Sequence, residues 1–218
     1  MNLSAVQTLL QRIYDVRTEV DVDDFLITDP ALAATLDTSP VARVCDEKLL
    51  IGSTPDELAL SLFIDAAVLD RLDTDNPQRE LHEANLEDFC TALEGVSHFL
   101  YVVHRAREGR NVTLLELELQ AEVDKYVGVH AVLATQGASV APRNLLRRLF
   151  ENVRFDDRLG SVERGRYSDA NNFAHRYCGH LESRYLGARS PQALIDELRL
   201  FDRLDQTNKL KRIAASPH

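Results

Sequence analysis

The stretch "EANLEDFCTALEGVSHFLYVVHRAREG", residues 83–109, decides the fold class. Apolar side chains recur along it at helical spacing, at Leu86, Phe89, Leu93, Val96, Leu100 and Val103. A spacing of three and four residues places these side chains on one face of a helix. Gly109 stands where a C-terminal cap is expected, because glycine readily adopts the left-handed conformation of such caps. The sequence therefore predicts a long amphipathic helix over 83–108.

The stretch that follows, "NVTLLELELQAEVDKYV" at residues 111–127, predicts a second long helix over about 113–135. Thr113 is suited to the N-cap position, and Glu116 three residues later completes a capping-box pattern. Along this segment the apolar residues form two strips, separated by two polar ridges. Such a pattern is typical of a helix that is packed on two sides, near the middle of a bundle.

The rest of the chain is also mainly helical in pattern. Helices are predicted over 3–17, from Asp29-Pro30, over 54–73, about 142–152, 168–186 and 190–212. Only "VARVCDEKLLIG", residues 41–52, has strand character, and it predicts one short β-hairpin. The expected fold is mostly α, a helical bundle of six to seven helices in a single domain over 1–218. A small N-terminal subdomain over 1–52 is the alternative.

Composition indicates an ordinary globular protein. Apolar residues make up 44% of the 218 residues and charged residues 28%, which is not the profile of a disordered chain. The N-terminal residues lack the basic start and unbroken apolar core of a secretory signal, and no apolar run approaches the ~18 residues of a membrane span. The three cysteines, Cys45, Cys90 and Cys178, form no CxxC pair. We therefore expect a soluble protein in a reducing cytoplasm, away from membranes.

Charge is distributed unevenly along the chain. Residues 1–100 hold 6 Lys/Arg against 20 Asp/Glu, whereas residues 101–218 hold 19 against 15. The simplest interpretation is that the acidic half packs against the basic half, or that both are solvated. The alternative is an anion-binding surface for nucleic acid in the arginine-rich region 143–166. Its candidate residues are Arg143, Arg147, Arg148 and Arg154.

Glu118 and Glu122 form the first candidate site. They lie one helical turn apart, with Lys125 three residues beyond Glu122. On an exposed face, which we expect, two neighbouring carboxylates cost only a few tenths of a kcal/mol. If the pair were buried, it would require a metal ion, a proton or an arginine.

Glu94 and His98 form the second candidate site, on one ridge of the first long helix. A glutamate and a histidine one turn apart can share a metal ion, or the carboxylate can orient the imidazole. The commoner arrangement is a hydrogen-bonded network between neighbouring helices, and we expect it here. Carboxylate-bridged di-iron bundles use a Glu-x-x-His pattern twice, whereas here the spacing is four residues and occurs once.

His175, Cys178 and Glu182 share one face of the predicted 168–186 helix and form the third candidate site. A cysteine beside a histidine suggests a nucleophile, but Cys178 lies in mid-helix, where no free backbone N–H groups can form an oxyanion hole. The three residues could instead bind a metal ion. The favoured interpretation is a polar seam between helices with a small buried thiol.

The sequence ranks three functional hypotheses, since it contains no glycine-rich phosphate loop, GxSxG or HExxH motif. The favoured one is a non-catalytic cytoplasmic helical protein, with no cofactor predicted, that acts through protein–protein interaction as an adaptor, an accessory subunit or a homo-oligomer. The first alternative is a metal-binding helical-bundle enzyme in which Glu and His residues from three helices converge on a divalent metal ion. The second is a nucleic-acid-associated protein that uses the arginine-rich region.

Overall fold

The computed structural model describes residues 2–37, 45–53, 58–137, 145–151, 153, 158–186 and 190–216. These residues form a mostly helical protein with a small three-stranded sheet. The predicted fold class is therefore confirmed. Three predicted elements fall partly outside the described residues: the first strand of the hairpin at 41–52, the start of the 54–73 helix, and parts of the helix at about 142–152. The residues concerned are 41–44, 54–57, 142–144 and 152.

Helices and strands alternate in the part of the chain before the two long helices, and the described elements after them are all helical. The N-terminal part contains α1 (Leu3–Tyr14), the 3-10 helix η1 (Val22–Phe25), β1 (Leu26–Ile27), α2 (Pro30–Leu36), β2 (Glu47–Ser53), β3 (Leu58–Ile64) and α3 (Ala66–Thr74). The remainder contains α4 (Leu86–Arg107), α5 (Leu114–Thr135), the π-helical turn η2 (Arg147–Glu151), α6 (Ser161–Leu181), the π-helical turn η3 (Glu182–Leu186), α7 (Pro191–Arg203) and α8 (Gln206–Ala215).

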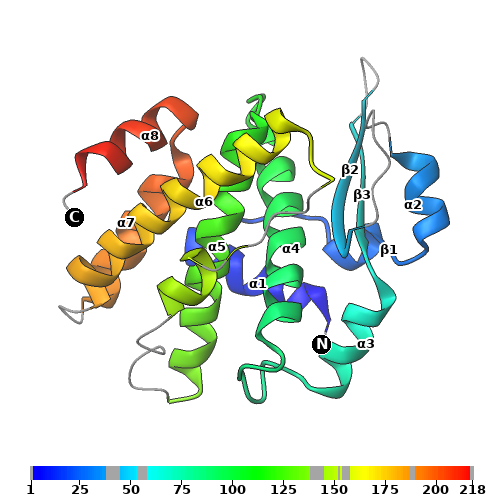
Figure 1. The fold of residues 1–218 in the computed structure, drawn as a ribbon, viewed down its shortest axis with the longest axis horizontal. Helices are drawn as coiled ribbons and strands as arrows, with labels where there is room; N and C mark the ends of the chain where they lie inside the picture. Colours follow the sequence, from blue (N-terminus) through cyan, green and yellow to red (C-terminus); the bar gives the residue numbers. More distant parts are fainter. Residues whose placement is uncertain are drawn as a thin grey trace.

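The two long helices α4 and α5 lie side by side at the centre of the molecule, with α6, α7 and α8 on one side and the sheet on the other (Figure 1). Their bounds confirm the predicted helices over 83–108 and 113–135. Gly109 has a φ of +64°, and the Arg110 N–H donates to the Arg105 carbonyl at 2.9 Å, as in a Schellman cap. At the start of α5, the Thr113 hydroxyl accepts from the Glu116 N–H at 3.1 Å. Because α5 packs against both α4 and α6, the predicted two-sided packing is also confirmed.

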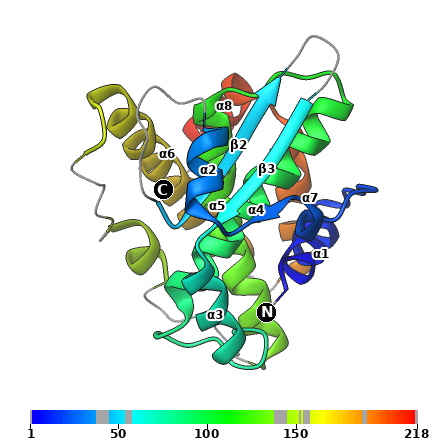
Figure 2. The ribbon, with the colours of Figure 1, turned by 90° about the vertical axis from the view of Figure 1, so that its right-hand side faces the viewer.

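The sheet has the order β1-β3-β2, with β2 antiparallel and β1 parallel to β3. It lies between α2 and α4, and Figure 2 shows α2 in front of it. Successive side chains of a strand point to opposite faces. Leu62 and Ile64 therefore enter the main core, whereas Phe63 packs with Ala33 of α2 and Leu50 of β2.

The predicted helix over 54–73 is wrong across residues 58–64, which form β3. The run "LALSLFI" is short and apolar, and a run of this length fits a buried strand as well as a helix. This run forms a strand because it pairs with β2, with Leu62 opposite Leu49. The helix begins only at Ala66, where the Asp65 side chain caps the Ala67 N–H at 2.8 Å. The antiparallel pair thus consists of residues 47–53 and 58–64 instead of lying within 41–52.

Two other boundaries in the C-terminal half differ from the prediction. The helix predicted to begin at 168 begins at Ser161, so residues 161–167 are helical instead of a loop. The helix predicted over 190–212 is divided into α7 and α8, and the Asp205 side chain caps α8 by accepting from the Asn208 N–H at 2.8 Å. This division turns α8 back onto α6 and brings Lys209 into the interior.

One continuous apolar core takes side chains from every described α-helix except α2, including Leu10, Leu93, Val123, Tyr177 and Phe201. Both α1 and β2 pack against α4. Among the described residues, the alternative subdomain 1–52 therefore has no apolar core of its own beyond the small group that includes Ala33 and Leu50. The domain count stays a prediction. No described helix combines the length and the apolar character that a membrane crossing needs.

Candidate metal centre

A group of charged side chains is enclosed where β2, α4, α5 and α6 meet. We call it the carboxylate–histidine cluster; its members are Glu47, Glu94, His98, Glu118, Glu122, Lys125 and Arg166. The helical repeat places Glu94 and His98 on one ridge of α4, and Glu118 and Glu122 on one ridge of α5. Because α4 and α5 pack along their length, the two ridges face each other.

His98 is at the middle of this cluster and is only 6% exposed. Its Nδ1 lies 3.3 Å from Oε1 of Glu47, within hydrogen-bond distance. Its Nε2 lies 3.5 Å from Oε2 of Glu118 but forms no hydrogen bond. Burial opposes protonation of the imidazole, yet the carboxylates of Glu47 and Glu118 outweigh it and raise the pKa of His98 well above its ordinary value.

Glu94, His98 and Glu118 each offer one ligand atom, and these three atoms lie within 4.8 Å of one another. Ligand atoms held about 2.0–2.2 Å from a tetrahedral ion lie roughly 3.3–3.6 Å apart. The separations between the three atoms would therefore have to shorten by up to about 1.5 Å, which rotations of the two glutamate side chains can provide. This spacing fits a metal centre.

Two cations partly neutralise the carboxylates. The Lys125 Nζ donates to Glu94 at 3.0 Å and to Glu122 at 2.8 Å, and the Arg166 Nε lies 3.6 Å from Glu118. Burial raises the pKa of Glu122. Burial acts the same way on Glu94, but Lys125 outweighs it and lowers the pKa of that carboxyl. Four carboxylates counted as ionised against Lys125 and Arg166 leave a formal charge of −2 when His98 is neutral.

The expectation that Glu118 and Glu122 lie on an exposed face is wrong. Glu118 is 8% exposed, and Oε2 of Glu122 is buried without a hydrogen bond. The physical reason is the two-sided packing of α5, which α4 covers on one side and α6 on the other. A buried pair of acids requires a metal ion, a proton or a positively charged side chain. Lys125 and Arg166 supply only part of that compensation.

The third candidate site lies elsewhere on α6 and does not join the cluster. His175 is half-exposed, with Nε2 3.9 Å from Glu151, and Glu182 accepts from the Tyr126 hydroxyl at 3.3 Å. Cys178 is fully buried in the main core, and burial raises the pKa of its thiol well above the ordinary value. The interpretation as a helix seam with a buried thiol agrees with this placement, whereas convergence of His175 and Glu182 with the other pairs is wrong.

Sequence reasoning missed two members of the cluster. Glu47 stands at the start of β2, in the middle of the hairpin predicted over 41–52. Arg166 stands in the first turns of α6, in a stretch assigned to a loop. Arg166 belongs to the arginine-rich region, and that enrichment was the one available signal; nothing near Glu47 distinguishes it from other acids.

The candidate arginines do not gather into a described surface. Arg148 pairs with Glu83, and Arg147 is exposed. Arg143 and Arg154 lie outside the described residues. The nucleic-acid hypothesis therefore gains no geometric support from the part of the chain that the structure describes.

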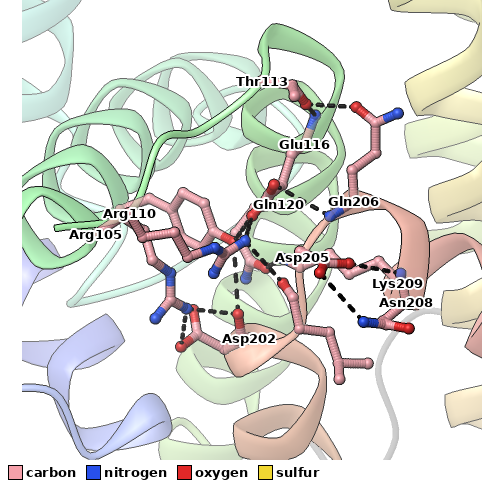
Figure 3. A network of polar contacts seen from close by, with 12 residues as sticks. Arg105, Arg110, Thr113, Glu116, Gln120, Asp202, Asp205, Gln206, Asn208 and Lys209 are labelled. Atoms are coloured by element: carbon pink, nitrogen blue, oxygen red, sulfur yellow. Dashed lines mark hydrogen bonds and ion pairs between the residues drawn. The ribbon is translucent and has the colours of Figure 1, made fainter. Parts of the chain in front are cut away.

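A second polar network joins α7 and α8 to α4 and α5 (Figure 3). The Arg105 guanidinium donates to the Asp202 carboxylate at 2.7 Å, and Lys209 donates to Gln120. Glu116, which the sequence assigned to a capping box, instead accepts from Arg110, from the Tyr101 hydroxyl and from the Gln206 N–H. The cavity beside this network measures about 10 Å³, room for about one water molecule. The network therefore connects helices and has no space for a substrate.

No protein-family model, no curated protein and no solved structure matches this chain. The geometry of the carboxylate–histidine cluster is thus the basis for assigning a function.

Proposed function

We propose that the protein binds a divalent first-row transition-metal ion through Glu94, His98 and Glu118. The observation that carries this proposal is a set of three ligand atoms within 4.8 Å of one another, one of them an imidazole nitrogen of the buried His98. Nε2 of this imidazole makes no hydrogen bond and has only the long ion pair with Glu118, at 3.5 Å. A metal ion would replace that ion pair with direct bonds from Nε2 and Glu118 to one cation.

The surroundings of His98 suit a metal ligand. Histidines that bind metals usually donate their other ring N–H to a carboxylate, which fixes the tautomer and the orientation of the ring. Glu47 accepts from Nδ1 in this way, which leaves Nε2 for the ion. A mixed set of one imidazole and two carboxylates favours Zn²⁺, Fe²⁺ or Mn²⁺. Because the pKa of His98 is raised, binding would displace a proton from the imidazole, and the charge of +2 would then balance the formal −2 of the cluster.

The number of protein ligands also indicates which reaction type the metal ion could support. Three protein ligands are typical of catalytic zinc sites, where a water molecule occupies the fourth position. The Glu94 side chain is 27% exposed, so solvent can reach the site. An activated, metal-bound water is therefore the chemistry that this centre would supply.

Metal content tests the proposal directly. Protein purified without a metal-affinity tag is expected to carry, or to take up from Zn²⁺ or Mn²⁺, about one ion per chain, and the ion should raise the melting temperature. His98→Gln is expected to weaken binding by at least the roughly 10- to 100-fold that loss of an outer-shell partner costs. Plasma mass spectrometry and calorimetric titration measure both effects.

Two further variants make the test specific. His175→Gln removes another histidine from the predicted set, but one that lies outside the cluster, and should bind as the wild type does. Lys125→Met removes the cation that competes for Glu94, and should tighten binding. Wild-type protein that takes up neither ion, or a His98→Gln variant with unchanged affinity, would refute the metal centre.

The two other hypotheses stay predictions. Protein–protein interaction is the function that a metal-free result would favour, because the carboxylates would then act only as an ion-paired link between α4, α5, α6 and the sheet. Nucleic-acid binding would have to show the steep salt dependence that phosphate contacts produce.

A further inference from the structure

A cavity of about 280 Å³ lies between α1, α5, η3 and α7, apart from the metal centre. Its described lining is almost wholly apolar and includes Ile13, Val127, Ala131, Leu181, Leu194 and Leu198. A cavity of about 150 Å³ with such a lining holds benzene, and ligand pockets begin at about 300 Å³. The size therefore suits a molecule of two to three fused or linked rings.

The cavity carries no formal charge at its wall. None of its described lining residues is Asp, Glu, Lys or Arg. Two tyrosines reach it, but their hydroxyls already donate to carboxylates behind the wall, Tyr126 to Glu182 and Tyr185 to Glu197, each at 3.3 Å. Arg212 neutralises Glu197, so selection against an anionic ligand rests on the cost of moving its charge from water to an apolar wall.

Two polar side chains in the wall, His130 and Ser190, form no hydrogen bond among the described residues. Ser190 lies at the start of α7, whereas His130 lies on α5 and contacts the ring of Tyr126, with centroids 4.7 Å apart. Burial lowers the pKa of His130 to about 4, so the ring is neutral at pH 7 and can donate one hydrogen bond and accept another. An apolar pocket with a small number of convergent polar groups is the usual form of a small-molecule site.

We propose that this cavity binds an uncharged, largely aromatic or alicyclic small molecule that makes a single hydrogen bond to His130. The neutral wall selects against anions, and the volume limits the ligand to about two to three rings. His130 provides the orientation, while burial of apolar surface provides most of the affinity.

A matched pair of fluorescent probes tests both size and charge. N-phenyl-1-naphthylamine is neutral and has an N–H group, and 1-anilinonaphthalene-8-sulfonate has the same ring skeleton with an added negative charge. The neutral probe is expected to bind once per chain and to saturate, with an affinity at least about tenfold higher than that of the sulfonate. Equal binding of the two probes, or no saturable binding of the neutral one, would overturn the proposal.

Variants locate the bound probe. Ala131→Leu fills the cavity and should reduce affinity for the neutral probe at least tenfold, whereas Ala106→Leu, an exposed site on α4, should leave it unchanged. His130→Leu keeps the wall apolar and should reduce affinity by about 3- to 10-fold, the share of one neutral hydrogen bond. Helix content and melting temperature are measured for each variant. Unchanged affinity in both cavity variants would show that the probe binds elsewhere and would refute the site.

Discussion

Asp202→Ala is expected to lower the free energy of unfolding by about 3 kcal/mol, the lower end of the roughly 3–5 kcal/mol for breaking a buried ion pair. Arg105 is 1% exposed, and its guanidinium donates to the Asp202 carboxylate at 2.7 Å. Removal of that carboxylate leaves a buried charge with weaker compensation. The loss stays at the lower end because the Glu108 carboxylate, at 2.8 Å, and the Asp202 carbonyl remain.

Urea denaturation of matched variants measures this effect. Glu108 binds the same guanidinium but is 45% exposed, so Glu108→Ala should cost less than about 1 kcal/mol, as exposed ion pairs do. Asp169→Ala, at an exposed position on α6, should cost less than about 0.5 kcal/mol. If Asp202→Ala and Glu108→Ala had equal effects, the buried Asp202 would contribute no more to compensating the Arg105 charge than the exposed Glu108 does.

The long helices could be predicted because their local signals agree. In α4 and α5 the apolar periodicity runs over many turns, and both Thr113 and Gly109 mark the ends with residues suited to caps. β3 lacks such agreement. Its apolar run has the composition of a buried strand or a buried helix, and only pairing with β2, which lies earlier in the chain, determines its conformation.

Each of the two residue pairs of the candidate site could be predicted from the sequence, but not that the two pairs lie together. The spacing of Glu94 and His98, and of Glu118 and Glu122, fixes each pair on one helix ridge. Their convergence depends on how closely the elements approach, and two glycines permit that approach. A Cβ at Gly128 would lie 2.6 Å from Leu93, and a Cβ at Gly95 would lie 2.9 Å from Glu47. Such contacts between distant segments leave no periodic pattern in the sequence.

The burial of Glu118 could not be predicted for a related reason. An acid in a helix is exposed in most proteins, and the elements that cover Glu118 come from other parts of the chain. The compensating charge of Arg166 comes from α6, about 50 residues later, and a one-dimensional pattern does not pair the two. The same holds for Lys209, which becomes buried only because α8 turns back after Leu204.

Lys209 is expected to make the protein more stable as the pH rises from 8 to 10. Its side chain is fully buried, with Nζ 4.7 Å from the ring centroid of Tyr101 and 4.8 Å from that of Phe201. Burial lowers the pKa of Lys209 to about 8, although the carboxylates of Asp202, Glu116 and Asp124 act in the opposite direction and Arg105 acts with burial. In the unfolded chain the lysine pKa is about 10.4.

The sign of the effect follows from proton counting. Between about pH 8 and 10.4 the unfolded state keeps a proton that the folded state has released, and stability rises with pH wherever the unfolded state holds more protons. At about 1.36 kcal/mol for each unit of pKa difference, the full effect is roughly 3 kcal/mol, and roughly 2.5 kcal/mol of it develops by pH 10. Above pH 10 the tyrosines oppose it, because burial raises the pKa of Tyr101 in the folded state, so the unfolded state loses those protons first.

Lys209→Met isolates this contribution, because every other titrating group is common to both proteins. The free energy of unfolding, measured by urea denaturation at pH 7, 8, 9 and 10, should rise in the wild type relative to Lys209→Met by roughly 2–2.5 kcal/mol over the upper two units. Lys211→Met, at an exposed position on the same helix, should give a curve parallel to that of the wild type. If the Lys209→Met curve were also parallel, Lys209 would keep its proton up to pH 10. The charges of Asp202, Glu116 and Asp124 would then outweigh burial, and α8 would be held by a lysine that stays charged instead of one that loses its proton near pH 8.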